Sequence, residues 1–118
     1  MMKKSQIVQD WDVIILGAGP GGYIAAVEAA TAGKSVMLVE KKELGGVCLN
    51  EGCVPTKTML HSAHIFKGLN SGSDAGISCG SLDWNQPVMQ DWKNKVIDRF
   101  RNGIGLLMKK NRDRKSVV

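Results

Sequence analysis

Two cysteines, Cys48 and Cys53, are the residues of this 118-residue chain with the most distinctive chemistry. They stand five positions apart in the run Gly-Val-Cys-Leu-Asn-Glu-Gly-Cys-Val-Pro, which begins at Gly46. In a cytosolic chain, such a close pair favours redox chemistry or metal binding over a structural cross-link. Regular helix between the cysteines would hold their Cα atoms about 8–9 Å apart, which exceeds the reach of a disulfide. Gly52 and Pro55 favour an irregular turn, which would permit the bond.

The surroundings of the pair favour thiolate anions. Both cysteines lie at or near the predicted start of a helix, and a helix N-terminus favours negative charge. Lys57 follows Cys53 by four positions, so on a helix the two side chains would share a face. A reactive dithiol is therefore one expectation for this segment.

Two other interpretations of the cysteines stay open at this point. The thiols could be buried and unlinked, or they could bind zinc. Zinc takes four ligands, usually with two to four residues between paired cysteines, and His61 and His64 are further donors nearby. Because the three cysteines include no second pair, we expect no metal site and interpret the histidines as ordinary helix positions. Cys79, in a Gly/Ser-rich stretch, is interpreted as an incidental thiol.

A glycine-rich run over residues 17–22, Gly-Ala-Gly-Pro-Gly-Gly, is suited to binding phosphate. It matches the pattern G-x-G-x-x-G, in which each glycine has a physical task. Gly17 permits a tight turn out of a strand, Gly19 lets a pyrophosphate approach the backbone, and Gly22 lets the following helix lie close to the strand. The N-terminus of that helix would present free N–H groups to the phosphates.

Glu40 adds a second feature of a dinucleotide site. It ends the second predicted strand, eighteen positions after Gly22, where a carboxylate would accept hydrogen bonds from ribose hydroxyls. The same charge disfavours a 2′-phosphate, and with it a ligand of NADP type. The motif predicts dinucleotide binding rather than a glycine-rich turn used only for packing, but it does not distinguish FAD from NAD.

These motifs require a βαβ unit to position them. Residues 11–16 form a nearly continuous apolar run, which predicts a parallel strand buried on both faces. The alanine-rich residues 23–32 predict a helix that Gly33 caps, and residues 35–39 predict the second strand.

Two long helices are predicted beyond the βαβ unit, at residues 54–67 and 87–110, with loops at residues 41–46 and 68–81. The second helix carries apolar residues at three- and four-residue steps, which we interpret as core packing rather than a cofactor site. These residues are Val88, Trp92, Val96, Phe100, Ile104, Leu107 and Met108.

Composition excludes several classes of protein. Hydrophobic residues make up 43% and charged residues 23% of the chain, which fits a folded domain rather than a disordered segment. No apolar run approaches the roughly 18 residues that span a bilayer, and residues 1–10 are polar and lack the apolar region of a signal peptide. We therefore expect a cytoplasmic protein without a membrane segment.

The net charge of +5 raises the question of a polyanionic partner. No nucleic-acid motif accompanies the charge, so we interpret the basic cluster as a solvated helix end and tail and expect no nucleic-acid binding. The cluster consists of Lys109, Lys110, Arg112, Arg114 and Lys115.

Together, the glycine motif, Glu40 and the run Gly-Gly-x-Cys-x-Asn-x-Gly-Cys-x-Pro-x-Lys resemble the pyridine nucleotide–disulfide oxidoreductases. Dihydrolipoamide dehydrogenase, glutathione reductase and mercuric reductase belong to that family. The resemblance extends from about residue 11 to residue 111. Within the family, residues 48–57 and 102–111 look closest to the bacterial dihydrolipoamide dehydrogenase branch.

The resemblance implies specific roles. Cys48 would exchange with a dihydrolipoyl dithiol, Cys53 would be the thiolate nearer the flavin, and Lys57 would approach the flavin ring. Electrons would pass from the dithiol to the cysteine pair, to FAD and then to NAD. The family often has Thr where this chain has Val47, so we expect a modestly weaker phosphate contact. The residues expected to bind FAD are Gly17, Gly19, Pro20, Gly22, Glu40, Lys41, Gly46, Val47, Cys48 and Lys57.

The resemblance also implies an α/β architecture: a Rossmann-like FAD-binding βαβ unit plus two long helices, in a truncated doubly wound parallel sheet. Residues 1–118 would form an incomplete FAD-binding domain, in which residues 1–10 are a polar extension. Residues 112–118 do not continue as the family does, which we interpret as a frameshift or an artificial cut. The NAD site would lie in a missing domain, and the chain by itself is expected to be inactive.

The partners implied by the resemblance are dihydrolipoamide or a lipoyl domain, within a 2-oxo acid dehydrogenase or glycine cleavage complex. The full-length form would be a homodimer. The alternatives are a truncated non-catalytic remnant, a dinucleotide-binding module of the same family, or a relative of glutathione or mercuric reductase.

Overall fold

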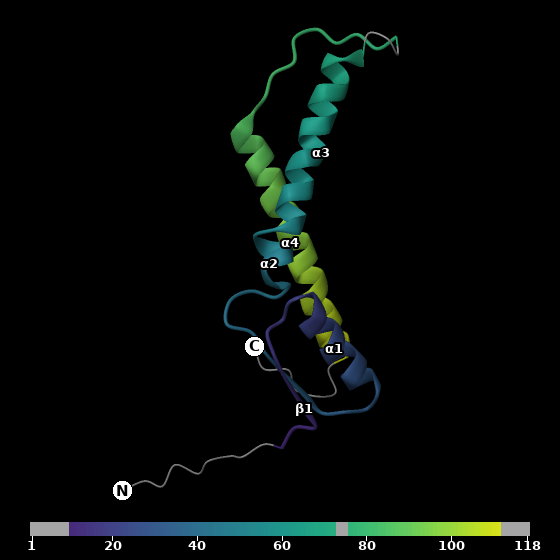
Figure 1. The fold of residues 1–118 in the computed structure, drawn as a ribbon, viewed down its shortest axis with the longest axis vertical. Helices are drawn as coiled ribbons and strands as arrows, with labels where there is room; N and C mark the ends of the chain where they lie inside the picture. The colour runs from purple at the N-terminus through teal and green to yellow at the C-terminus, as the bar shows by residue number, and fades with distance from the viewer. Residues whose placement is uncertain (1–9, 73–75, 112–118) are drawn as a thin grey trace, which may run out of the picture.

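The structure is a computed structural model that describes residues 10–72 and 76–111. The polar extension, apart from Asp10, and the tail at residues 112–118 lie outside the described residues. Two strands and four helices follow one another in the described part (Figure 1). They are β1 (Val13–Leu16), α1 (Pro20–Thr31), β2 (Val36–Val39), α2 (Gly46–Asn50), α3 (Cys53–Asn70) and α4 (Gln86–Lys110).

The predicted βαβ unit is confirmed. Strands β1 and β2 pair in parallel, with Val13 opposite Val36 and Leu16 opposite Val39, and α1 connects them. The helix begins at Pro20, three residues earlier than predicted, because proline is well suited to the first turn of a helix. The core of the unit consists of the buried residues Ala18, Ala26, Val36 and Leu38.

The second face of this sheet is exposed, which corrects the expectation that β1 is buried on both faces. Along β1, half-buried and exposed residues alternate, and the exposed side chains include Ile14 at 58% and Leu16 at 80%. The physical reason is that α1 covers one face only, and the described residues form a sheet of two strands. A doubly wound sheet stays a prediction.

Helices α3 and α4 form a long hairpin, residues 53–110. Its closed end extends away from the βαβ unit, whereas the C-terminal half of α4 lies beside α1 (Figure 1). Near its far end the rings of Phe66 and Trp84 meet edge to face, with centroids 5.7 Å apart. Helix α4 is capped by Asn85, whose side chain accepts a hydrogen bond from the backbone N–H of Val88. The radius of gyration is 21.4 Å, against about 13–14 Å for a compact domain of this length. The hairpin therefore has much more surface than core.

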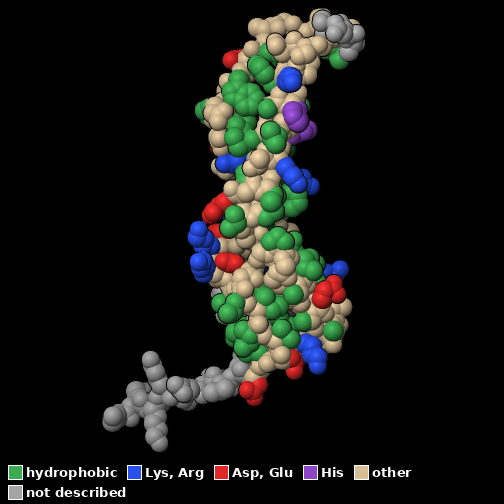
Figure 2. Space-filling model, in the orientation of Figure 1, with side chains coloured by type: hydrophobic (Ala, Val, Ile, Leu, Met, Phe, Trp, Pro, Cys, Tyr) green, Lys and Arg blue, Asp and Glu red, His purple; other side chains and the backbone are tan. Residues whose placement is uncertain are grey.

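The prediction that the apolar stripe of α4 packs in a core is confirmed only in part. Val96 and Ile104 are half-buried, and Met108 packs against the core of the βαβ unit. Val88, Trp92 and Phe100 are each more than half exposed, whereas the buried residues of α4 are Met89 and Ile97. Figure 2 shows hydrophobic side chains at the surface along the hairpin and over the βαβ unit. None of the described helices is long and apolar enough to cross a membrane.

Candidate functional site

A short helix lies in a stretch, residues 46–50, for which the sequence predicted no regular element. Helix α2 starts at Gly46, and its N-cap is Gly45. Both glycines have positive φ, +100° at Gly45 and +64° at Gly46, which other residues rarely adopt. A glycine pair predicts a break in regular structure, but glycine is also a favoured N-cap residue, and that second signal indicates the helix.

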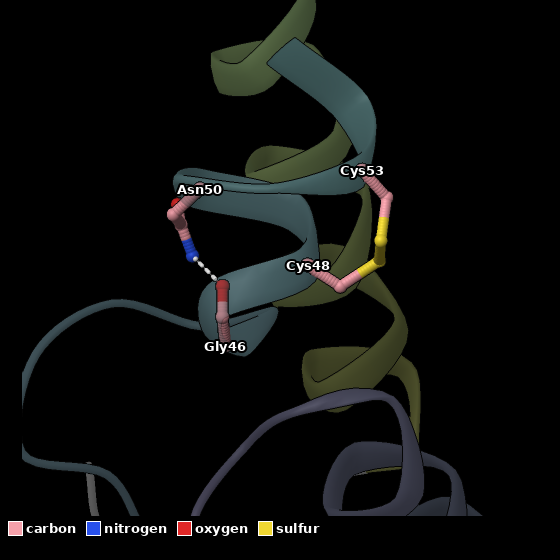
Figure 3. The surroundings of a disulfide bond; sticks show 4 residues. All are labelled: Gly46, Cys48, Asn50 and Cys53. Atoms are coloured by element: carbon pink, nitrogen blue, oxygen red, sulfur yellow. Dashed lines mark hydrogen bonds between the residues drawn. A yellow bond between two sulfur atoms is a disulfide. The ribbon is translucent and has the colours of Figure 1, made fainter. Parts of the chain in front are cut away.

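Cys48 and Cys53 form a disulfide, with their Cα atoms 4.7 Å apart (Figure 3). Cys48 lies in α2, and Cys53 is the first residue of α3. Residues 51–52 interrupt the helix between them, so the predicted irregular turn is confirmed and unlinked thiols are excluded. Because each sulfur is bonded to the other, neither is available as a thiolate ligand for zinc.

The two cysteines differ in accessibility, since Cys48 is half-buried and Cys53 is exposed. Lys57 lies one helical turn after Cys53 on α3 and is also exposed. It lines a shallow depression between α3 and α4, together with apolar residues such as Val54 and Trp92. Cys79 lies far along the chain and is a free, exposed thiol.

The glycine turn between β1 and α1 has the backbone geometry that the motif predicts. Gly17 has a φ of +95°, and a Cβ at Gly22 would overlap the carbonyl oxygen of Gly17. Gly19 is the N-cap of α1 and offers no side-chain hydrogen bond to the helix, which leaves first-turn N–H groups for a ligand. Gly46 approaches the same turn so closely that a Cβ there would lie 2.7 Å from the Cα of Gly19.

Glu40 accepts backbone hydrogen bonds from the glycine turn and from the loop that follows Glu40 itself. One carboxylate oxygen accepts a hydrogen bond from the N–H of Ala18 at 2.7 Å, and the other accepts from the N–H of Lys42 at 2.9 Å. These bonds, that of Ala18 foremost, hold the pKa of Glu40 below its ordinary value. The ionised carboxylate has further lone pairs, so both oxygens retain capacity for ribose hydroxyls.

A groove of about 760 Å³ joins the glycine turn to the cysteine turn. Its lining includes six of the residues that sequence analysis assigned to FAD: Gly17, Gly19, Glu40, Lys41, Gly46 and Val47. The other four, Pro20, Gly22, Cys48 and Lys57, lie outside this lining. The structure thus brings together six of the ten candidates, with the disulfide on the adjoining turn and Lys57 in a separate depression.

Asn50 and Arg101 also line the groove. Asn50 stands in the cysteine motif but was given no role there, and no sequence pattern singled out Arg101. The amide nitrogen of Asn50 donates to the carbonyl oxygens of Leu44 and Gly46, at 3.0 and 2.8 Å. Its amide oxygen accepts from Nη2 and Nε of Arg101, at 2.8 and 3.2 Å. The two residues are 51 positions apart, so no local pattern could have linked them.

The residues present fit an adenine dinucleotide such as FAD. Left-handed glycines let the backbone approach a ligand, the N-terminus of α1 favours phosphate, and Glu40 presents an ionised carboxylate at the groove. A side chain at Gly46 would collide with the backbone of Gly19 and force the two turns apart. The geometry and charge of the lining are therefore compatible with such a ligand.

Comparison with known proteins supplies the family. Residues 11–117 match the sequence profile of the family described as pyridine nucleotide-disulphide oxidoreductase. Dihydrolipoyl dehydrogenase of Acholeplasma laidlawii is 44% identical over 106 residues, which cover 87% of this chain and 31% of the relative. Dihydrolipoyl dehydrogenase of Manduca sexta is 41% identical over 112 residues, which cover 93% of this chain and 22% of the relative.

A solved structure agrees with these relatives. The HOCl-induced flavoprotein disulfide reductase RclA of Escherichia coli, solved as a Cu(II) complex, superimposes with a TM-score of 0.73 and 26% sequence identity. That match covers 93% of this chain and 22% of RclA. The chain therefore spans between about a fifth and a third of the length of these relatives. Since the profile match takes in nearly all of its residues, this chain belongs to the pyridine nucleotide–disulphide oxidoreductase family.

Proposed function

We propose that this chain is the FAD-binding and redox-disulfide part of a dihydrolipoyl dehydrogenase. The observation that carries the proposal is the place of the Cys48–Cys53 disulfide, on the turn that follows Gly46. Gly46 forms one wall of the nucleotide groove and lies against Gly19 in the phosphate turn. A ligand bound in this groove would contact both the phosphate turn and the turn that carries the disulfide, whose sulfurs lie outside the groove lining.

The reaction proposed for the cysteines is thiol–disulfide exchange. A thiolate of dihydrolipoamide attacks the sulfur of Cys48, the Cys48–Cys53 bond breaks, and Cys53 leaves as a thiolate. The second substrate thiolate attacks the substrate sulfur of the mixed disulfide and releases Cys48. The substrate has then lost two electrons and two protons and closed its own disulfide, and the protein holds a reduced cysteine pair.

The proposed cofactor is FAD, held by the glycine turn, Glu40 and the loop that contains Gly46. When bound there, FAD would supply the redox chemistry that links the reduced cysteines to NAD, whose site we place outside these 118 residues. Val47 presents no hydroxyl to this groove, although it is 71% exposed, so backbone groups must make the phosphate contact there. Lys57, one turn beyond Cys53, would approach the flavin ring.

The proposed setting follows from the same activity. The substrate is dihydrolipoamide or a lipoyl domain, the assembly is a 2-oxo acid dehydrogenase or glycine cleavage complex, and the complete enzyme is a cytoplasmic homodimer. No nucleic-acid or membrane partner is proposed.

Flavin capture followed by substrate reduction tests this function. The purified chain is mixed with FAD and desalted. One sample is denatured, and the flavin it releases is quantified. Dihydrolipoamide is added without oxygen to a second, native sample. We expect retained flavin, and bleaching of its absorbance that is lost in the double variant Cys48→Ser/Cys53→Ser. Failure to retain flavin at saturating FAD, or equal bleaching in the double variant, would contradict the proposal.

A second candidate is a non-catalytic chain that binds a dinucleotide without turnover. The observation that favours it is the exposed face of the sheet, where Leu16 is 80% exposed. Retained flavin that dihydrolipoamide fails to bleach would support this candidate. Faster bleaching by glutathione than by dihydrolipoamide would instead indicate a relative of glutathione reductase.

A further inference from the structure

We propose that Asn50 and Arg101 are positioning residues that set the equilibrium between the disulfide and dithiol forms of Cys48 and Cys53. This inference rests on the proposed function, because it concerns the same cysteine pair. Neither residue contacts the sulfurs. Each acts through α2, the short helix that carries Cys48.

Asn50 uses all of its hydrogen-bonding groups to hold α2 in place. Its amide nitrogen bonds the carbonyl oxygens of Leu44 and Gly46, one on each side of the left-handed Gly45. Its amide oxygen accepts two bonds from the guanidinium of Arg101. Figure 3 shows the Asn50 side chain and the disulfide on opposite sides of the turn, so Asn50 restrains α2 without obstructing the sulfurs.

Arg101 anchors this contact to α4. Its side chain is only 30% exposed, and it also pairs with Glu43 at 3.4 Å and with Asp98 at 3.2 Å. One guanidinium therefore joins α4, the loop before α2 and the end of α2. A planar guanidinium that donates twice to one oxygen fixes orientation as well as distance.

Helix α2 needs such an anchor because it has only five residues. Helices of that length are unstable alone, since nucleation costs more than their few hydrogen bonds return. Once the disulfide is reduced, the distance between Cys48 and Cys53 depends on the contacts that hold α2 against α3 and α4. A well-held α2 keeps the two thiols close, which raises their effective concentration toward one another and favours the disulfide.

The test equilibrates the chain with dithiothreitol. The protein disulfide gains two electrons and two protons to become two thiols, while dithiothreitol loses them and closes a cyclic disulfide. The equilibrium constant is measured without oxygen, at several ratios of reduced to oxidised dithiothreitol. Free thiols are alkylated, and mass spectrometry then gives the fractions of disulfide and dithiol protein. Every variant carries Cys79→Ser, because Cys79 is a free, exposed thiol.

We expect Arg101→Ala to shift the equilibrium about tenfold toward the dithiol, which corresponds to about 30 mV for a two-electron couple. Arg101→Lys retains the charge and one donor, so it should recover part of the shift. Arg99→Ala is the matched control: it removes the same charge from α4, but Arg99 lines a pocket with Tyr23 and Ile24 that includes no residue of the cysteine turn. A double-mutant cycle with Asn50→Ala should be non-additive, because both changes break one contact.

Equilibrium constants for Arg101→Ala and Arg99→Ala that agree within twofold would overturn the inference. Circular dichroism reports whether each variant folds. If Arg101→Ala unfolds, Asn50→Asp replaces it: this change keeps the acceptor for Arg101 but sets a carboxylate against two carbonyl oxygens, so the same shift is expected, and its absence counts against the inference. Because the assay contains no flavin, a chain that fails to bind FAD leaves this outcome unaffected, and the two proposals fail separately.

Discussion

The backbone N–H of Gly45 donates to the carbonyl oxygen of Ala18 at 2.8 Å. This bond joins the loop that leads into the cysteine turn to the turn that would hold the phosphates. Glu40 strengthens the junction, since its carboxylate accepts from the N–H of the same Ala18. Hydrogen bonds therefore connect the cysteine turn to the nucleotide turn, and a substitution that displaces one turn should also displace the other.

Gly46→Ala tests the close approach of the two turns. Its Cβ would lie 2.7 Å from the Cα of Gly19, at a φ of +64°. We expect a loss of stability of at least about 1–2 kcal/mol from the left-handed backbone alone, together with weaker FAD binding, measured by urea unfolding and flavin fluorescence. The matched control is Gly68→Ala, inside α3 with open space around it, where alanine should stabilise the helix by about 0.5–1 kcal/mol. Equal effects of the two changes would contradict this interpretation.

Glu40→Gln tests the pH dependence of the junction. Hydrogen bonds from Ala18 and Lys42 lower the pKa of Glu40 in the folded chain, so the stability it contributes is fully present above the ordinary glutamate range. That stability is lost as the pH falls through the lowered, folded-state pKa. The difference in unfolding free energy between the native chain and Glu40→Gln should therefore be constant near neutral pH and shrink in acid. Glu28→Gln on α1 serves as the control. If the difference in unfolding free energy between the native chain and Glu40→Gln increases in acid, the pKa of Glu40 is not lowered in the folded chain.

Single cysteine variants identify which sulfur a substrate attacks. Cys53→Ser leaves Cys48, which should be captured as a mixed disulfide when the chain is mixed with oxidised lipoamide and analysed by mass. Cys48→Ser leaves Cys53, which is the more exposed of the two and which we expect to be captured more slowly. Both variants carry Cys79→Ser, so that each retains a single thiol. Faster capture by Cys53 would show that exposure outweighs the family role and would exchange the two assignments.

Two leucines of the sheet should respond differently to truncation. Leu38 is 1% exposed, so Leu38→Ala should cost about 2–5 kcal/mol of stability through lost burial and the cavity left behind. Leu16 is 80% exposed, so Leu16→Ala should change the unfolding free energy by less than about 0.5 kcal/mol. Urea unfolding of both variants measures the contrast. A large cost at Leu16 would mean that this face of the sheet is covered in solution.

Much of the local structure was predictable from the sequence. Short-range patterns define the βαβ unit, because strand and helix periods and the glycines of a turn act within a few residues of one another. The same holds for the cysteine turn, where Gly52 and Pro55 forecast the departure from helix that the disulfide needs. These features depend on backbone conformation near each residue, which the neighbouring residues largely determine.

Only the tertiary structure decided which distant residues meet and which apolar residues are buried. The contact between Asn50 and Arg101 depends on the angle at which α4 crosses the cysteine turn, and no pattern of sequence 51 residues apart specifies that angle. The exposure of Trp92 and Phe100 could not be predicted either, because periodicity shows that a helix has an apolar face but not whether another element covers it. Burial and long-range hydrogen bonds depend on how the helices and strands are positioned relative to one another, which only the packed structure determines.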